Sequence, residues 1–355
     1  MCDAKRNYSR IGKVKRSHLL GALIGIVFVA ALPFFIKDEY TLGFLVLAGI
    51  VSLIVTGLNM LVGHAGQLSL GHGGFYAIGA YASTILTIRF GFTPFPALIV
   101  AAIATGLVAL LLGIPLLKML TQFHLAVATL IFVMLINAIL IVGGGWTGGF
   151  TGIQGQPPFS IGPIVFEGDV ANYYLVWGVV FLGILFAAGL SNSQAGRVLR
   201  AIQGDETGAQ SLGIDVAWEK VKVFVISAIY ASVAGSLLAH YTGSVTPAQF
   251  GVGPSLEFMV MVFLGGRGSV IGGVVGGTFI KLLPQVTEFM KNYRLLVDGL
   301  ILTGVLLFVP QGIVGLFKKI WDRRPGGKSP EEAASLSWKA SSSSVALAKP
   351  EAKGE

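Results

Sequence analysis

Long uninterrupted runs of apolar residues recur along the chain, and they restrict its fold more than any other feature. Several runs, such as Leu42–Val62 and Phe95–Leu117, are close to the roughly 20 residues that a helix needs to cross a bilayer core. Only 12% of the 355 residues are charged and 54% are hydrophobic, whereas a soluble domain has about 25% charged residues. Transmembrane strands alternate apolar and polar residues, and these runs do not alternate. The sequence therefore predicts an all-α, polytopic bundle of transmembrane helices.

About eight to ten membrane segments are expected, with boundaries accurate to a few residues. One of them, Leu256–Leu283, is interrupted by "GGRGS" at Gly265–Ser269, so it is expected to form a re-entrant pair or two short spans. The first span is expected to be a retained helix, because its apolar stretch is longer than that of a typical signal peptide. That first span is Leu19–Ile36. The remaining expected spans are Leu42–Val62, Leu68–Ile88, Phe95–Leu117, Leu125–Val142, Tyr173–Leu190, Val223–Tyr241 and Leu295–Phe317.

Lysine and arginine residues set the expected orientation, because cytoplasmic loops of membrane proteins are enriched in them. The arm at residues 1–18 and the chain after Phe317 are basic, whereas Gly143–Asn172 contains no Lys or Arg. We therefore expect both termini in the cytoplasm and the loop Gly143–Asn172 on the outer face. The expected organisation is a basic arm (1–18), a transmembrane permease domain (19–317) with a cytoplasmic loop at 191–222, and a disordered cytoplasmic tail (318–355).

Two glycine-rich stretches, Gly57–Tyr81 and Phe263–Gly277, fall within the predicted spans. Small residues let helices approach closely in lipid, and this packing role accounts for most of these glycines. Their clustering with polar residues such as Asn59 and His72 also predicts interrupted helix, which is tolerated at membrane depth only where it is buried or lines a cavity. Broken helices in a transporter indicate the solute path.

The inventory of reactive residues excludes several function classes. The charged residues expected near span ends are Glu257, Lys281, Glu288 and Asp298, and Arg267 at the bend is the charge expected to lie deepest. The chain therefore lacks the buried carboxylate that an ion-coupled carrier needs. The chain has no phosphate-binding G-x-x-x-x-G-K-[ST] loop, and its histidines show no metal-ligand spacing. Basic residues at membrane flanks form no nucleic-acid-reading surface. We expect no enzyme activity, no cofactor and no metal, but a conduit for a small solute that is passive or driven by another protein.

The polar segment Ser191–Lys222 interrupts the apolar chain in its middle. Within it, "GRVLRAIQGDETGAQSLGI" at Gly196–Ile214 has apolar residues at roughly helical spacing and charges on other faces. Glycines at Gly204, Gly208 and Gly213 are expected to divide it into short helices. It is either a solvated amphipathic loop or a protrusion that docks into a groove of a cytoplasmic partner.

Three blocks of the sequence resemble those of a known family. Gly196–Ile214 resembles the segment by which inner-membrane permeases of ABC importers contact the ATPase subunit. "GLNMLVGHAGQLSLGHGGFYAIGAY" and "LGGRGSVIGGVVGG" are similar to two further blocks of the branched-chain amino acid permeases, specifically the M-type partner of a two-permease pair. The resemblance covers about Leu42 to Gly315.

This resemblance implies a function, partners and site residues. The chain would translocate branched-chain or related amino acids across the inner (plasma) membrane by alternating access. Its partners would be two cytoplasmic ABC ATPase subunits, a second homologous permease subunit, a periplasmic solute-binding protein and the lipid bilayer. The resemblance assigns ATPase coupling to Gly196, Arg197, Arg200, Ala201, Asp205, Glu206, Ala209 and Gly213. It assigns the translocation-path motifs to Asn59, Gly63, Gly66, Ser69, Gly71, Phe75, Gly265 and Gly266.

Other transport functions compete with this interpretation. A permease of a urea or short-amide ABC importer would carry the same blocks, and a passive channel would need no ATPase. His64 and Arg267 depart from the residues that are frequent in the family blocks. A path rich in Gly, Ser, Asn and aromatic residues suits many small polar solutes, so the sequence leaves the solute open.

Overall fold

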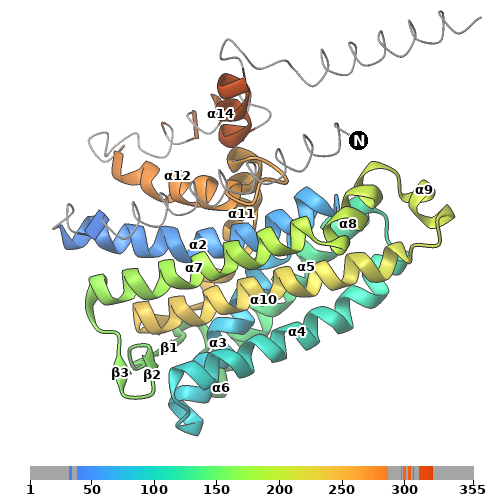
Figure 1. Ribbon diagram of the computed structural model, residues 1–355. Helices are drawn as coiled ribbons and strands as arrows, with labels where there is room; N and C mark the ends of the chain where they lie inside the picture. The colour runs from blue at the N-terminus through green and yellow to red at the C-terminus, as the bar shows by residue number, and fades with distance from the viewer. Residues whose placement is uncertain are drawn as a thin grey trace, which may run out of the picture.

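The structure, a computed structural model, describes residues 32–33, 38–286, 297, 299–300, 303–304, 307 and 312–322. The expected first span and most of the expected last span therefore lie outside the described residues. The long helices are α2 (Glu39–His64), α3 (His72–Phe90), α4 (Pro94–Met119), α5 (Gln122–Val142), α7 (Gly168–Asn192) and α10 (Val216–Thr242). The shorter helices are α6 (Gly144–Thr147), α8 (Gln194–Gly204), α9 (Glu206–Ser211), α11 (Val252–Gly265), α12 (Gly272–Val286) and α14 (Gly312–Asp322). The long helices lie side by side as a bundle (Figure 1), which confirms the all-α prediction.

Short elements cover the end of the bundle where α7 begins and α10 ends (Figure 1). They are the 3-10 turns η1 (Gly149–Thr151) and η2 (Pro247–Phe250) and four two-residue strands. Strand β1 (Ile153–Gln154) pairs antiparallel with β4 (Ser244–Val245), and β2 (Ser160–Ile161) pairs antiparallel with β3 (Ile164–Val165). The expected loop Gly143–Asn172 is thus a folded cap on the bundle.

Burial divides the helices into an inner and an outer set. Among the described residues, six helices are long and apolar enough to cross a membrane. The apolar stretch of α2 is 94% buried and that of α10 is 72% buried, whereas those of α4, α5 and α7 are 33%, 22% and 17% buried. A helix that is apolar on all sides belongs inside a bundle or in lipid. Helix α2 is therefore the central helix, and α4, α5 and α7 present apolar faces suited to lipid.

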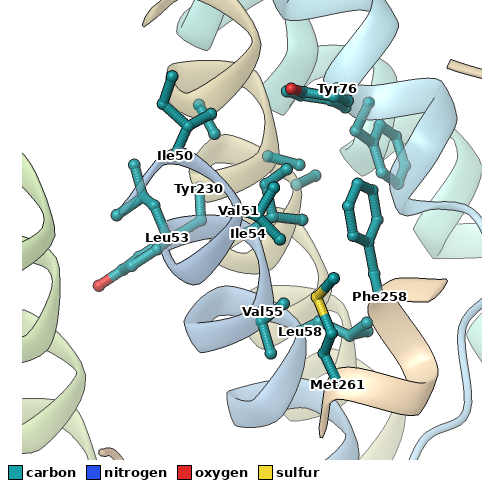
Figure 2. Packing of buried hydrophobic residues seen from close by; sticks show 14 of the residues in the cluster. Ile50, Val51, Leu53, Ile54, Val55, Leu58, Tyr76, Tyr230, Phe258 and Met261 are labelled. Atoms are coloured by element: carbon teal, nitrogen blue, oxygen red, sulfur yellow. The ribbon is translucent and has the colours of Figure 1, made fainter. Parts of the chain in front are cut away.

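The side chains of α2 pack against residues of α10 and α11 (Figure 2). Ile54 and Leu58 of α2 lie near Phe258 and Met261 of α11, while Tyr230 of α10 packs from another side. The Tyr230 hydroxyl also donates a hydrogen bond to the Gly183 carbonyl of α7 at 2.6 Å. Residues from α2, α7, α10 and α11 thus form one contiguous core.

Helices α3 and α10 touch through glycine. A Cβ at Gly79 of α3 would overlap the Ser232 carbonyl of α10, and one at Gly235 of α10 would overlap the Tyr76 carbonyl of α3. Only the absence of a side chain lets these backbones approach so closely. This contact confirms the packing role expected for these small residues.

Helices α11 and α12 form an antiparallel hairpin. A Cβ at Gly276 would overlap the Met261 carbonyl, and a Cβ at Gly265 would overlap the Gly272 carbonyl. Helix α11 has 14 residues, about 21 Å, and together with the preceding turn η2 it is one of the six candidate membrane spans. The predicted break at "GGRGS" is confirmed, since α11 ends at Gly265 and α12 begins at Gly272.

Several predicted boundaries were wrong, each for a local reason. Helix α3 begins at His72 rather than Leu68, because Gly66 adopts a φ of +69° and the next five residues form no regular secondary structure. Helix α10 begins at Val216, where Asp215 accepts a hydrogen bond from the Trp218 nitrogen at 3.1 Å. The predicted loop 191–222 therefore ends inside a long helix.

Two further boundaries differ from expectation. Gly208 lies inside α9 and does not divide the polar segment, since its helical conformation costs glycine only about 1 kcal/mol relative to alanine. Helix α14 runs to Asp322, beyond Phe317, where the last span was expected to end. At the start of α2, the Thr41 hydroxyl donates a hydrogen bond to Asp38, and this bond holds the pKa of that carboxyl below its ordinary value.

Candidate functional site: a locked helical hairpin and an amphipathic segment

Asn59 joins the two glycine-rich stretches. Its Oδ1 accepts a hydrogen bond from the Gly268 nitrogen at 2.9 Å, and its Nδ2 donates to the Ser269 carbonyl at 2.7 Å. Nδ2 also lies 3.3 Å from the Gly266 carbonyl. The side chain is 2% exposed, so one buried amide of α2 binds three backbone groups of the turn between α11 and α12, two of which also take part in the turn's own hydrogen bonds. We call this set of contacts the Asn59 lock.

Gly63, one turn further along α2, makes room for the same turn. A Cβ at Gly63 would overlap the Gly268 nitrogen and would lie 2.8 Å from Asn59 Oδ1. The start of α14 packs on the turn as well, because a Cβ at Gly312 would overlap the Gly266 Cα. The structure therefore brings together four of the predicted path residues, Asn59, Gly63, Gly265 and Gly266.

Three other predicted path residues form a second cluster at the start of α3. Ser69 Oγ accepts a hydrogen bond from the Gly71 nitrogen at 3.3 Å. A Cβ at Gly71 would lie 3.0 Å from the Thr129 Cβ of α5. Phe75 is fully buried, and its ring lies 4.9 Å from that of Phe132 and 5.5 Å from that of Phe224. This cluster anchors α3 to α5 and α10.

The remaining path residue, Gly66, lies apart from both clusters. It follows the end of α2, and a Cβ there would lie 3.3 Å from Gln203 Cγ of α8. Gln122 of α5 donates a hydrogen bond to its carbonyl. Seven of the eight predicted path residues are buried, and Gly66 is half-buried. In this structure they hold the broken helices in place.

Helices α8 and α9 protrude at the end of the bundle opposite the strands (Figure 1). Gly196 seats α8 against the end of α7, because a Cβ there would overlap the Ser191 carbonyl. Leu199 packs into the main core, while Ile202 and Ala209 form a small cluster with Val216 of α10. The segment is thus amphipathic and folded onto the bundle by its apolar face.

The other face of this segment is exposed. Arg197, Ala201 and Asp205 are all exposed. Asp205 caps α9 by accepting a hydrogen bond from the Thr207 nitrogen at 3.0 Å. Gly213, with a φ of +80°, turns the chain toward α10. Arg200 is exposed too, but its Nη1 donates to the Ser191 carbonyl at 2.8 Å and so neutralises the C-terminal end of α7.

Glu206 is tied to a residue that the sequence did not single out. Its Oε1 lies 2.6 Å from Lys220 Nζ, with the Lys220 side chain 8% exposed and the Glu206 side chain 51% exposed. Lys220 looked like a loop charge, because α10 was predicted to begin at Val223. With α10 starting at Val216, Lys220 faces back toward α9, and the ion pair fixes α9 against α10.

We expect Glu206→Gln to loosen α9 without unfolding the bundle. The change leaves the Lys220 ammonium nearly buried without its carboxylate, which costs about 1–2 kcal/mol, less than for a fully buried pair because Glu206 is half exposed. Hydrogen exchange of the α9 amides should therefore accelerate about tenfold. Glu219→Gln is the control, since its partner Lys222 is 46% exposed and stays hydrated without the carboxylate, and equal exchange in both variants would contradict the assignment.

The end of α2 is coupled to the same region. His64 Nε2 lies 3.0 Å from Ser191 Oγ at the end of α7, three residues before α8 begins at Gln194. Together with the Gly66–Gln203 contact, this hydrogen bond places the amphipathic segment against the end of α2, the helix that also carries Asn59. A buried central helix, a helical hairpin interrupted by glycines and apolar outer helices are features of a multi-pass helical membrane protein.

Comparisons with known proteins identify the family. The family model described as branched-chain amino acid transport system / permease component matches residues 40–310. The high-affinity branched-chain amino acid transport system permease protein LivM of Escherichia coli is 28% identical over 343 residues, covering 90% of this chain and 80% of that protein. The permease protein LivH of the same organism is 32% identical over 144 residues, covering 40% of this chain and 46% of that protein.

Another relative is named for a different solute. The autoinducer 2 import system permease protein LsrC of Salmonella paratyphi B is 29% identical over 193 residues, covering 51% of this chain and 54% of that protein. No solved structure matches the chain. Because the family model spans most of the sequence, the chain belongs to the family of branched-chain amino acid transport system permease components.

Proposed function

We propose that this chain is the membrane-spanning subunit of an ABC importer that carries branched-chain or related amino acids across the inner membrane. Two cytoplasmic ATPase subunits drive it, a second homologous permease completes the path, and a periplasmic binding protein delivers the solute. The observation that carries the proposal is the folded α8–α9 segment, which is seated on α2, α7 and α10 and exposes Arg197, Arg200 and Ala201. In this proposal residues 191–222, the basic arm 1–18 and the tail 318–355 all face the cytoplasm.

The contacts of α8 and α9 supply a mechanical route into the bundle. Movement of the segment acts on α10 through the Glu206–Lys220 pair and on the end of α2 through Gly66 and His64. Since α2 is joined to the hairpin by the Asn59 lock, displacement of α2 also displaces α11 and α12. A nucleotide can shift the bundle between inward- and outward-open states only if the ATPase contacts those two states differently. Because the α8–α9 segment is folded onto the bundle, it is suited to transmit that difference to the other helices.

The opposite end of the bundle supports a receiving role for the binding protein. His240 of α10 lies 3.0 Å from Ser83 of α3 and 2.9 Å from the Pro157 carbonyl. Arg89 at the end of α3 donates a hydrogen bond to the Gly145 carbonyl and stacks over Trp146. The cap is therefore tied to α3 and α10, so a protein that docks on it gains direct contact with the inner helices.

Reconstitution tests the proposed function against its alternatives. The chain is co-expressed with the neighbouring permease, ATPase and binding-protein genes, and uptake of radiolabelled leucine and urea into proteoliposomes is measured. We expect leucine uptake that requires both ATP and the binding protein. Leucine or urea flux through the purified chain alone would favour a passive channel, and ATP-driven uptake of urea without leucine would favour the short-amide importer.

A further inference from the structure

A groove separates the middle of α7 from the middle of α10. Its volume is about 300 Å³, and Leu53 of α2 is among the residues that line it. Each of its two walls is one stripe of a helix, because the side chains recur at helical spacing. The walls consist of Val179, Leu182 and Phe186 of α7 and of Ile226, Ile229 and Val233 of α10.

The two helices meet at the base of this groove. The Tyr230 hydroxyl donates a hydrogen bond to the Gly183 carbonyl at 2.6 Å. A Cβ at Gly183 would lie 2.8 Å from Leu53 Cδ1, so the missing side chain lets α7 rest on α2. Away from the base the groove is open, since Leu182 is 65% exposed and Phe186 is 55% exposed.

The position and chemistry of the groove limit what can fill it. It covers positions 179–186 of the candidate membrane span Gly168–Asn192 and positions 226–233 of the span Val216–Thr242. Among the described residues that line it, Tyr230 is the one polar side chain, and its hydroxyl is already bonded. Water finds too few polar partners there, and an amino acid would be buried without partners for its charges. The occupant must therefore be hydrocarbon.

The size of the groove distinguishes a hydrocarbon chain from a helix. From Val179 to Phe186 the groove runs about 10 Å along α7. A volume of about 300 Å³ over this length gives a mean cross-section of about 30 Å², whereas a helix about 10 Å in diameter needs about 80 Å². One extended hydrocarbon chain fits this space, and it restores the dispersion contacts that an empty groove would lack.

A basic residue continues the α10 wall. Lys222 precedes Ile226 by four residues and so lies on the same face of the helix. Its side chain is 46% exposed and pairs with Glu219, which leaves donors of its ammonium group free for a further acceptor. Lysines near the ends of membrane helices reach toward the lipid headgroups, and phosphate oxygens are strong acceptors for them. The open groove thus leads to a site suited to a phosphate.

We propose that the groove binds one acyl chain of a membrane phospholipid whose phosphate lies at Lys222. The acyl chain completes the contact between α7 and α10 that their own side chains leave open. Because α7 ends at Asn192, just before α8 begins at Gln194, the bound lipid also supports the amphipathic segment. The site is independent of the identity of the transported solute.

Val233→Phe tests the site, because it places a ring where the acyl chain would lie. The full-length chain is purified in detergent with the subunits that accompany it, and bound phospholipid is counted by native mass spectrometry. Wild type is expected to retain one phospholipid more per chain than Val233→Phe. Phosphatidylglycerol added to delipidated protein should raise the thermal unfolding midpoint of wild type by about 2–4 °C and leave that of Val233→Phe unchanged. Val179→Phe fills the groove from the α7 side and should behave in the same way.

Matched variants outside the groove separate this site from general contact with lipid. Val100→Phe makes the same enlargement at an exposed position of α4 and should retain as much phospholipid as wild type. Lys222→Gln should lower the retained phospholipid, whereas Lys118→Gln, at an exposed position of α4, should not. Wild-type retention and a wild-type response to lipid in both groove-filling variants would overturn the proposal, and would indicate that a helix covers the groove.

Discussion

Replacement of Asn59 by leucine is expected to release the α11–α12 hairpin from α2 and to abolish transport. The side chain now satisfies the Gly268 nitrogen and the Ser269 carbonyl, with the Gly266 carbonyl nearby. Without Asn59 the Gly268 nitrogen loses its acceptor, whereas the Gly266 and Ser269 carbonyls keep the hydrogen bonds that they accept from the Ser269 and Gly272 nitrogens. A buried donor left without a partner costs about 1–3 kcal/mol. This cost of about 1–3 kcal/mol, together with the loss of the bonds that Asn59 donates, should lower the thermal unfolding midpoint of the detergent-solubilised protein and reduce uptake about tenfold or more.

Two companion variants separate the lock from a general packing defect. Asn59→Asp has the same shape but turns a carboxylate oxygen toward the Gly266 and Ser269 carbonyls, so its stability should fall at least as far as that of Asn59→Leu. Thr56→Val, one turn earlier on α2, loses only the local hydrogen bond to the Ser52 carbonyl and should cost about 1 kcal/mol. An Asn59→Leu protein with the unfolding midpoint and uptake of Thr56→Val would show that the lock is dispensable.

Arg200→Glu is expected to uncouple ATP hydrolysis from uptake while the bundle stays folded. Arg200 lies on the exposed face of α8, and its contact within the chain is the hydrogen bond to the Ser191 carbonyl. A reversed charge at a docking surface places like charges together and costs several kcal/mol. A negative charge at the C-terminal end of α7 is also unfavourable. Leucine taken up per ATP hydrolysed should therefore fall at least tenfold, a difference of about 1.4 kcal/mol or more.

Two control variants separate the effect of reversing any exposed charge from the loss of Arg200 itself. Lys118→Glu reverses an exposed charge at the end of α4, outside the amphipathic segment, and should keep wild-type coupling. Arg200→Lys retains the charge but not the planar donor group and should be partly coupled. Normal coupling in Arg200→Glu would remove the ATPase-docking role from α8.

The helical class and the broken hairpin were predictable from the sequence because each rests on local pattern. Apolar runs of membrane-spanning length imply helices whatever their neighbours are, and "GGRGS" interrupts such a run with residues that favour turns. The start of α3 was not predictable in this way. Residues 68–71 are apolar enough to continue a helix, but the Leu70 nitrogen donates to the Thr129 hydroxyl of α5, a contact that only the tertiary fold supplies.

Sequence reasoning identified residues of the candidate site but not the contacts that they make. Resemblance to the family singled out Asn59 and the Gly265–Gly266 pair, yet the partners of Asn59 lie 207 to 210 positions away in the chain. Lys220 was overlooked because its role depends on where α10 begins.

The central claim is that the α8–α9 segment lies in the cytoplasm, where the ATPase subunits bind it. The side of the membrane from which α8 can be labelled tests this claim most directly. Cys2 is the single cysteine of the chain, so a Cys2→Ser, Ala201→Cys protein has one thiol, placed on the exposed face of α8. A membrane-impermeant maleimide should label it in inside-out vesicles, should fail to label it in intact spheroplasts, and should react more slowly when the ATPase subunits are bound. Labelling of Ala201→Cys from the outer side of the membrane would contradict the importer account.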